Sequence, residues 1–377
     1  MLLLLGCATA FYDDPVPDLD GYAPGELVRV EHIARVSAAT LSWKAGTASP
    51  HGADVYRLMV RTEGLEGPDV ATARLALPRD TEPTALVAHL HGTVGLADRC
   101  APSRDGGFGF ESGSNPIAAR QVAAGRAVVA PDYLGLGPAG PHPYVAARPT
   151  ATSVLDSLRG ARELLDGDLP IALAGHSQGA HAALATLAHI ESYAPELELA
   201  GALALSTPGP ADQALAAILD EDAYAGFVAL ALVGLSSAHE LELDELLLPE
   251  VAENLPAELE ERCLSGLSGL IARPADELFQ PHLTDALLRG DLEAAGLQEV
   301  FEAERLDLPT EVPTLLLHGT DDELFPPEPT AQLAEALGAD IELVAGGDHL
   351  FLPWTARERA FAWLDEVLVP GRPSALW

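Results

Sequence analysis

Gly175-His-Ser-Gln-Gly179 lies between two stretches that decide the fold, Leu169-Pro-Ile-Ala-Leu-Ala174 and Ala180-His-Ala-Ala-Leu-Ala-Thr-Leu-Ala-His-Ile190. The apolar run over 169–174 predicts a short buried strand, and 180–190 predicts a helix. A G-x-S-x-G sequence between a strand and a helix is typical of a sharp turn that exposes its serine at the carboxyl edge of a sheet. We therefore expect Ser177 at a helix N-terminus, which favours negative charge developing beside it.

Residues 8 to about 25 are rich in Pro and Asp and are expected to be extended. The rest of the chain alternates predicted strands with predicted helices. Residues 55–61 alternate apolar with polar and predict an outer strand paired with 70–77. Helices are expected to end at 121–126, to span 148–165 with a cap near Thr150 or Thr152, and to span 358–367. Further apolar runs are typical of buried parallel strands and lie at 84–90, 127–130, 199–205, 314–318 and 341–344. This order predicts an α/β fold with a mainly parallel central sheet covered by helices on both faces.

The pattern changes between 208 and 306, where buried-strand runs stop. Residues 211–305 contain 21 Asp and Glu against four Arg, and helices are expected at 211–220, 223–236 and 240–251. We predict a helical acidic cap over the carboxyl edge of the sheet, inserted between core segments 25–207 and 307–377. Some apolar side chains of the cap are expected to line a pocket over Ser177, while others only pack; the candidates are Phe227, Leu230, Leu232, Val233 and Leu235.

Composition excludes some function classes. The 377 residues, 48% of them hydrophobic, are enough for one large α/β domain with an insertion or for two domains. The net charge of −36 argues against nucleic-acid binding and against electrostatic docking on anionic lipid. The sequence contains neither an H-E-x-x-H motif nor paired C-x-x-C motifs, so neither a metal nor a cofactor is expected. The oligomeric state is not predicted.

The N-terminus, Met1-Leu-Leu-Leu-Leu-Gly-Cys7, has no stretch long enough to span a bilayer. Leu-Leu-Gly-Cys resembles the lipobox of bacterial lipoproteins, in which the cysteine is lipidated after export. The apolar run is shorter than the roughly 7–15 residues of a signal peptide and lacks a basic region before it. Two interpretations stay open. Either residues 1–24 are an export segment and tail with lipidated Cys7, on a protein that is secreted or anchored on the bacterial envelope, or Cys7 belongs to an ordinary tail.

The other two cysteines are Cys100 and Cys263. An even pair in an exported protein suggests a disulfide, which would join the loop after the strand at 84–90 to the insertion. The alternative is two buried free thiols.

Candidate partners for Ser177 follow two later predicted strands. A serine needs a base within hydrogen-bond reach, and the base needs an orienting carboxylate. His318-Gly-Thr-Asp-Asp-Glu-Leu-Phe-Pro326 follows the strand at 314–318, and its H-G-x-x-D-x-x-x-P spacing favours Asp322 over Asp321 as the acid. Ala345-Gly-Gly-Asp-His349 follows the strand at 341–344 and makes His349 the candidate base.

Backbone N–H groups beside Ser177 are candidates for an oxyanion hole. One is that of Gln178, the residue after the serine, and the other comes from the loop His91-Gly-Thr-Val-Gly95. Within that loop we favour Thr93, with Gly92 and Val94 as alternatives. The histidines that flank Ser177, His176 and His181, are interpreted as packing or supporting groups.

Several stretches together resemble the secretory lipase family, the α/β-hydrolases related to fungal lipase A. The resemblance spans residues 25–370 and rests on 91–103, 125–137, 141–144, 153–159, 175–179, 318–326 and 347–349. It implies an exported serine carboxylic-ester hydrolase with a helical cap, acting on acylglycerols or smaller esters. It also implies triad roles for Ser177, Asp322 and His349, and a disulfide from Cys100 to the cap.

The leading hypothesis is an esterase or lipase that hydrolyses a small-molecule or lipid ester through an acyl-enzyme. Acyl transfer to an alcohol and amide cleavage use the same triad and remain alternatives. A hydrolase-like binding protein without catalysis is a further alternative, although such a protein would not need the three partners that this chain carries in order.

Overall fold

The computed structural model describes residues 10–105, 116–220 and 222–369 of the chain. Cys7, with its predicted lipidation and export signal, lies outside the described residues. Within the described ranges, no helix combines the length and the apolar character needed to cross a membrane.

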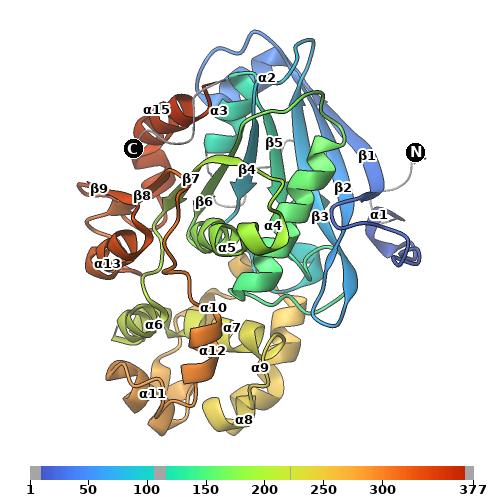
Figure 1. Ribbon diagram of the computed structural model, residues 1–377. Coiled ribbons are helices and arrows are strands. Elements are labelled where there is room, and N and C mark those ends of the chain that lie inside the picture. Colours follow the sequence, from blue (N-terminus) through green and yellow to red (C-terminus); the bar gives the residue numbers. More distant parts are fainter. Residues whose placement is uncertain (1–9, 106–115, 221, 370–377) are drawn as a thin grey trace.

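A nine-stranded sheet forms the centre of the molecule, in the order β1-β2-β3-β5-β4-β6-β7-β8-β9 (Figure 1). From β5 to β9 neighbouring strands pair in parallel, whereas β1, β2, β3 and β5 pair antiparallel. The parallel strands are short apolar runs because helices cover both of their faces. The strands are β1 Leu27–Val36, β2 Ala53–Glu63, β3 Pro68–Pro78, β4 Leu86–Leu90, β5 Ala127–Pro131, β6 Ile171–His176, β7 Leu199–Leu205, β8 Thr314–Gly319 and β9 Asp340–Val344.

Two apolar layers hold the helices against the sheet. One face packs against α2, α3, α14 and α15, and the other against α4, α5 and α13 (Figure 1). The fold class predicted from the sequence is confirmed. The helices outside the insertion are α1 Ala10–Asp13, α2 Ala38–Ala45, α3 Ile117–Ala123, α4 Ala147–Arg162, α5 Gln178–Tyr193, α13 Pro327–Leu337, α14 Leu352–Thr355 and α15 Arg357–Val367, with the 3₁₀ turns η1 Asp98–Cys100 and η2 Pro102–Arg104.

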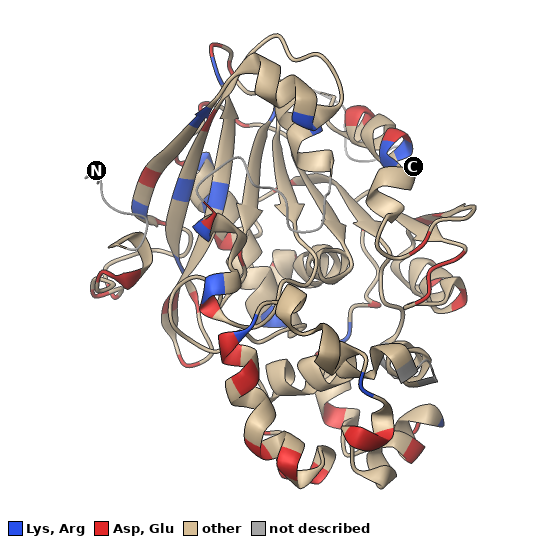
Figure 2. Ribbon diagram, turned by 180° about the vertical axis from the view of Figure 1, so that it is seen from behind, with Lys and Arg blue, Asp and Glu red and all other residues tan. Residues whose placement is uncertain are grey.

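A helical insertion between β7 and β8 lies beyond the carboxyl ends of the parallel strands (Figure 1). It has its own apolar core, which also includes Leu96, Tyr144, Leu324 and Phe325 from the sheet-bearing part. Figure 2 shows Asp and Glu gathered along the outer surfaces of its helices. The insertion contains α6 Ala211–Asp220, η3 Asp222–Tyr224, α7 Ala225–Ser236, α8 Leu243–Leu246, α9 Pro249–Glu261, η4 Leu264–Gly266, α10 Ser268–Ile271, η5 Ala275–Glu277, α11 Pro281–Leu288 and α12 Gln298–Ala303.

Three local expectations were wrong. Residues 55–61 are not on the edge of the sheet, because β1 pairs outside β2. The expected helix at 240–251 is split into α8 and α9, since Pro249 keeps Leu248 extended (φ −62°, ψ 146°). Part of the segment 8–25, expected to be extended, is helical: α1 buries Phe11 and Tyr12 against Met59 and Val70.

The predicted cap of α4 was also wrong. The helix begins at Ala147 and has neither Thr150 nor Thr152 as its cap; the residue in the cap position, Ala146, makes no side-chain cap. Instead, a carboxylate oxygen of Glu304, from the end of the insertion, accepts a hydrogen bond from the Ala147 N–H. A carboxylate at a helix N-terminus is favourable because it meets an unpaired N–H and the positive end of the helix dipole.

A disulfide joins Cys100 to Cys263 and so ties the insertion to the loop after β4. Beside it, Gly95 pairs with Cys263, and the Leu264 N–H donates to the Val94 carbonyl at 2.8 Å. The bond closes a loop of 163 residues.

We expect reduction of this disulfide to lower the free energy of unfolding by about 2–5 kcal/mol, because it frees a long loop of the unfolded chain. Urea unfolding with and without a phosphine reductant measures the change. The double variant Cys100→Ser, Cys263→Ser is the control and should be as unstable as the reduced protein and insensitive to reductant. Equal unfolding midpoints for oxidised and reduced protein would contradict the prediction.

Candidate active site

Ser177 lies in a strained turn between β6 and α5, with φ 56° and ψ −118°. The residues two positions before and two positions after it must be glycine. A Cβ on Gly175 would lie 1.9 Å from the Gly179 carbonyl oxygen, and a Cβ on Gly179 would lie 2.0 Å from the Leu90 carbonyl oxygen. The glycine spacing therefore allows the strand, the turn and the helix to pack closely enough to present the serine hydroxyl.

The structure brings Ser177, His349 and Asp322 into one hydrogen-bonded row. His349 Nε2 lies 3.0 Å from Ser177 Oγ, and its Nδ1 lies 3.1 and 3.0 Å from the two carboxylate oxygens of Asp322. An ionised carboxylate only accepts hydrogen bonds, so His349 Nδ1 carries the proton and Nε2 is left to accept from the serine. This is the arrangement that activates a serine hydroxyl.

Asp322 is held as an anion by its surroundings. Its Oδ1 accepts from the Leu324 N–H at 3.0 Å and the Phe325 N–H at 2.8 Å. Burial opposes ionisation, yet hydrogen bonds from His349 and Phe325 and the charge interaction with His318 bring the pKa of Asp322 below its ordinary value. The alternative acid, Asp321, is exposed and accepts from the Thr320 hydroxyl at 2.9 Å.

His176 contacts the backbone of His349. Its Nε2 donates to the His349 carbonyl oxygen at 2.8 Å. Burial lowers the pKa of His176 to about 3, so the ring is neutral and holds the His349 loop as a hydrogen-bond donor. This contact agrees with the supporting role that the sequence suggested.

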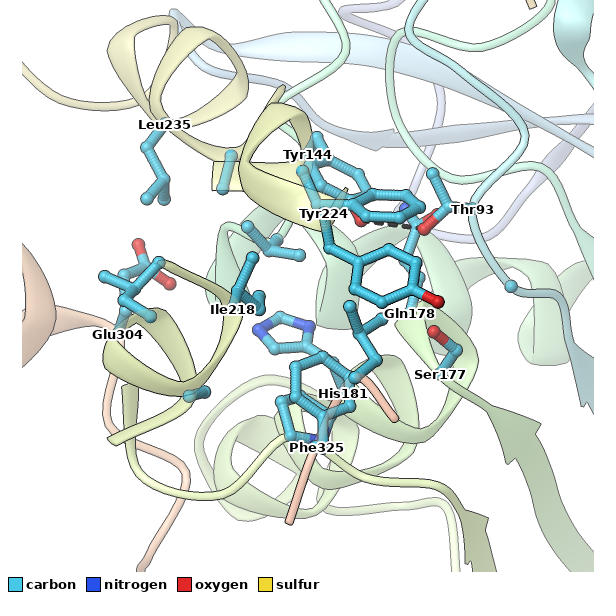
Figure 3. A pocket seen from close by; sticks show the side chains of 18 of the residues that line it. Thr93, Tyr144, Ser177, Gln178, His181, Ile218, Tyr224, Leu235, Glu304 and Phe325 are labelled. Atoms are coloured by element: carbon cyan, nitrogen blue, oxygen red, sulfur yellow. Dashed lines mark hydrogen bonds between the residues drawn. The ribbon is translucent and has the colours of Figure 1, made fainter. Parts of the chain in front are cut away.

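A cavity of about 1290 Å³ opens over Ser177, between the sheet edge and the insertion (Figure 3). The expected oxyanion residues Thr93 and Gln178 line it, as do Gly92 and Val94. Gln178 is the first residue of α5, and the first N–H groups of a helix have no acceptor within that helix. The Gln178 N–H is thus free of a partner within the helix and can donate to a ligand oxygen beside Ser177.

The walls contributed by the insertion are mainly apolar. Of the candidates on α7, Phe227 and Leu235 line the cavity, whereas Leu230 and Leu232 are buried in the core of the insertion and Val233 packs against it. His181, one helical turn after Ser177, also lines the cavity (Figure 3). Its side chain is 7% exposed, and burial lowers its pKa to about 4. Over the residues that the structure describes, no group of His, Cys, Asp or Glu is arranged to hold a metal ion.

Sequence reasoning did not assign roles to three residues that line the cavity or contact a residue lining it. His142 contacts Gln178, Tyr144 contacts Thr93, and Glu304 lines the far end of the cavity. Pro141-His-Pro-Tyr144 carries a sequence signal only as part of the family resemblance. Its placement beside Ser177 depends on the path of the chain between β5 and α4, which has no local sequence signal.

Three buried histidines should lower the free energy of unfolding in mild acid. Burial lowers the pKa of His89 to about 3, and those of His142 and His181 to about 4. The unfolded chain binds these protons near pH 6.5, so it holds more protons than the folded chain between pH 6.5 and 4, and the free energy of unfolding falls as pH falls.

From pH 7.5 to pH 5.5 the three groups together can lower the free energy of unfolding by up to about 4 kcal/mol, at ~1.4 kcal/mol each. Urea unfolding at the two pH values measures the difference. His181→Gln removes one of the three titrating groups, so the difference in the free energy of unfolding between the two pH values should be smaller by about 1.4 kcal/mol. A stability that rises on acidification to pH 5.5 would contradict this prediction.

The sheet order, the turn at Ser177 and the inserted helices define an α/β-hydrolase fold. Candida antarctica lipase A in its closed state superimposes with a TM-score of 0.76 at 22% identity, covering 96% of this chain and 87% of that one. The rice cell wall degrading esterase LipA from Xanthomonas oryzae superimposes with a TM-score of 0.76 at 21% identity, covering 92% and 98%.

Sequence comparison assigns the family. Residues 115–370 match the family model described as secretory lipase. The chain is also 28% identical over 356 residues to Lipase 2 of Candida albicans, a match that covers 83% of this chain and 72% of that protein. The chain belongs to the secretory lipase family and is a hydrolase that acts on carboxylic esters.

Proposed function

We propose that the protein hydrolyses carboxylic esters through an acyl-enzyme formed on Ser177. The row Ser177–His349–Asp322, with contacts of 3.0 Å on each side of the imidazole, is the observation that supports this proposal most directly. The Ser177 oxygen attacks the ester carbonyl carbon while its proton passes to His349 Nε2. The N–H groups of Gln178 and Thr93 stabilise the resulting oxyanion.

Collapse of this first intermediate breaks the bond to the alcohol, which takes the proton from His349. A water molecule then gives a proton to His349 Nε2 and attacks the acyl carbon. The acid leaves, and the proton returns to Ser177 Oγ. Throughout, Asp322 keeps the Nδ1 proton in place and stabilises the imidazolium, for which its low pKa is suited.

We propose lipid esters or similar apolar esters as substrates, because the cavity is large and its insertion walls include Phe227 and Leu235. We also propose that the protein is exported, supported by the secretory family and by a disulfide of the kind that persists in oxidising compartments. Anchoring through lipidated Cys7 stays a prediction.

A series of p-nitrophenyl esters tests the substrate proposal. We expect kcat/KM to rise up to about fourfold per methylene from acetate to octanoate, because each buried methylene contributes about 0.8 kcal/mol. Phe227→Ala should flatten this rise for the longer chains and leave the rate on acetate near that of the unaltered protein. A kcat/KM that falls steadily from acetate onward would contradict an apolar acyl site.

A further inference from the structure

The segment Pro141-His-Pro-Tyr144, between β5 and α4, is held tightly by its own backbone contacts. His142 Nδ1 donates to the Leu134 carbonyl oxygen at 2.7 Å, and the Tyr144 N–H donates to the His142 carbonyl oxygen at 2.8 Å. Gly135 has φ +75°, and a Cβ there would lie 2.1 Å from the Pro141 carbonyl oxygen. The segment therefore has little freedom to shift relative to the core.

His142 is tied to Gln178. Its Nε2 lies 3.1 Å from Gln178 Nε2. Burial lowers the pKa of His142 to about 4, so its ring is neutral, and Nδ1 already carries the proton given to Leu134. Nε2 must therefore accept, and the Gln178 amide donates to it. This bond orients Gln178, the residue whose backbone N–H begins α5 beside Ser177.

Tyr144 is tied to Thr93. Its hydroxyl lies 2.7 Å from Thr93 Oγ1, and both side chains line the cavity over Ser177 (Figure 3). Tyr144 is 7% exposed and packs directly against α7 of the insertion. The approach is so close that a Cβ on Gly234 would lie 2.5 Å from Tyr144 Cβ. Thr93 lies in the loop after β4 and Gln178 begins helix α5 after β6, yet each contacts a residue of the same short segment.

We propose that residues 141–144 set the spacing between the two oxyanion donors, with Tyr144 positioning Thr93 and His142 positioning Gln178. The inference rests on the proposed function, in which the N–H groups of Thr93 and Gln178 bind the oxyanion. Neither His142 nor Tyr144 takes part in bond making. Both act through the placement of donors whose contribution is made in the transition state.

Tyr144→Phe keeps the ring and removes only the hydroxyl. We expect kcat on p-nitrophenyl butyrate to fall about ten- to a hundredfold with KM within about twofold, because a misplaced donor weakens transition-state binding. Tyr193→Phe is the matched control. Its hydroxyl donates to Asp156 at 2.7 Å, it is not among the residues that line the cavity, and its loss should leave kcat unchanged.

A double-mutant cycle tests the coupling. Thr93→Ala removes the same hydrogen bond from the other side, so the inference is testable even where Tyr144→Phe does not fold. In the Thr93→Ala background, Tyr144→Phe should cause no further loss of kcat, whereas in the Thr93→Ser background the loss should persist. His142→Asn keeps a donor near the position of Nδ1, removes the acceptor for Gln178, and should also lower kcat without raising KM.

The inference is overturned if Tyr144→Phe leaves kcat unchanged or raises KM alone. It is also overturned if Tyr144→Phe lowers kcat by the same factor in the Thr93→Ala variant as in the protein that keeps Thr93. Failure of the proposed function would look different, since Ser177→Ala would then keep its activity. The two failures are therefore read from different variants.

Discussion

Replacing Ser177 with alanine is expected to lower kcat/KM on p-nitrophenyl butyrate by about 10⁴- to 10⁶-fold. The hydroxyl oxygen is the atom proposed to bond to the substrate, and no neighbouring group can take its place at the head of α5. The variant should also lose covalent labelling by a fluorophosphonate, which reacts with an activated serine. The fold should persist, because among the described residues the side chain loses a single hydrogen bond, the 3.0 Å contact with His349.

Ser206 offers a matched control for this variant. It follows β7 as Ser177 follows β6, it also has a positive φ (49°), and it is fully buried. It is not among the residues that line the cavity, so Ser206→Ala should retain activity and labelling. If Ser177→Ala kept activity within about tenfold of the unaltered protein, or kept the fluorophosphonate label, the acyl-enzyme proposal would be wrong.

Features with a local physical cause were predictable from the sequence. The buried parallel strands are apolar runs, and glycine is required at position 175 because a Cβ there would lie 1.9 Å from the carbonyl oxygen of Gly179, only four residues away. The contact between His349 and Asp322 was predictable because parallel strands end at one edge of the sheet, so the loops that follow them meet there.

Features that depend on distant contacts were not predictable. β1 carries charged residues at intervals and is only half-buried along most of its length, so it lacks the apolar pattern of a strand. The cap of α4 comes from Glu304, 157 residues away. The contacts of His142 and Tyr144 likewise join segments that are separated by 36 and 51 residues. Such contacts follow from the packing of the insertion and of the loops at the sheet edge, which no local pattern encodes.

Replacing Asp322 with asparagine is expected to lower kcat by about 10³- to 10⁴-fold. Both of its carboxylate oxygens lie within 3.1 Å of His349 Nδ1. An amide in that place offers N–H groups toward the ring and favours the tautomer with the proton on Nε2, which cannot accept from Ser177. The amide oxygen can still accept from the Leu324 and Phe325 N–H groups, so the loop should keep its shape.

The adjacent aspartate makes this test specific. Asp321→Asn is the same chemical change one residue earlier, on an exposed side chain whose hydrogen bond is to Thr320, and it should leave kcat within about twofold. Steady-state rates on p-nitrophenyl butyrate and the rate of fluorophosphonate labelling should fall together in Asp322→Asn, because both need the serine proton to reach His349. If Asp321→Asn caused the larger loss, the orienting carboxylate would be Asp321, and the hydrogen-bonded row would have to form in a conformation other than the one described.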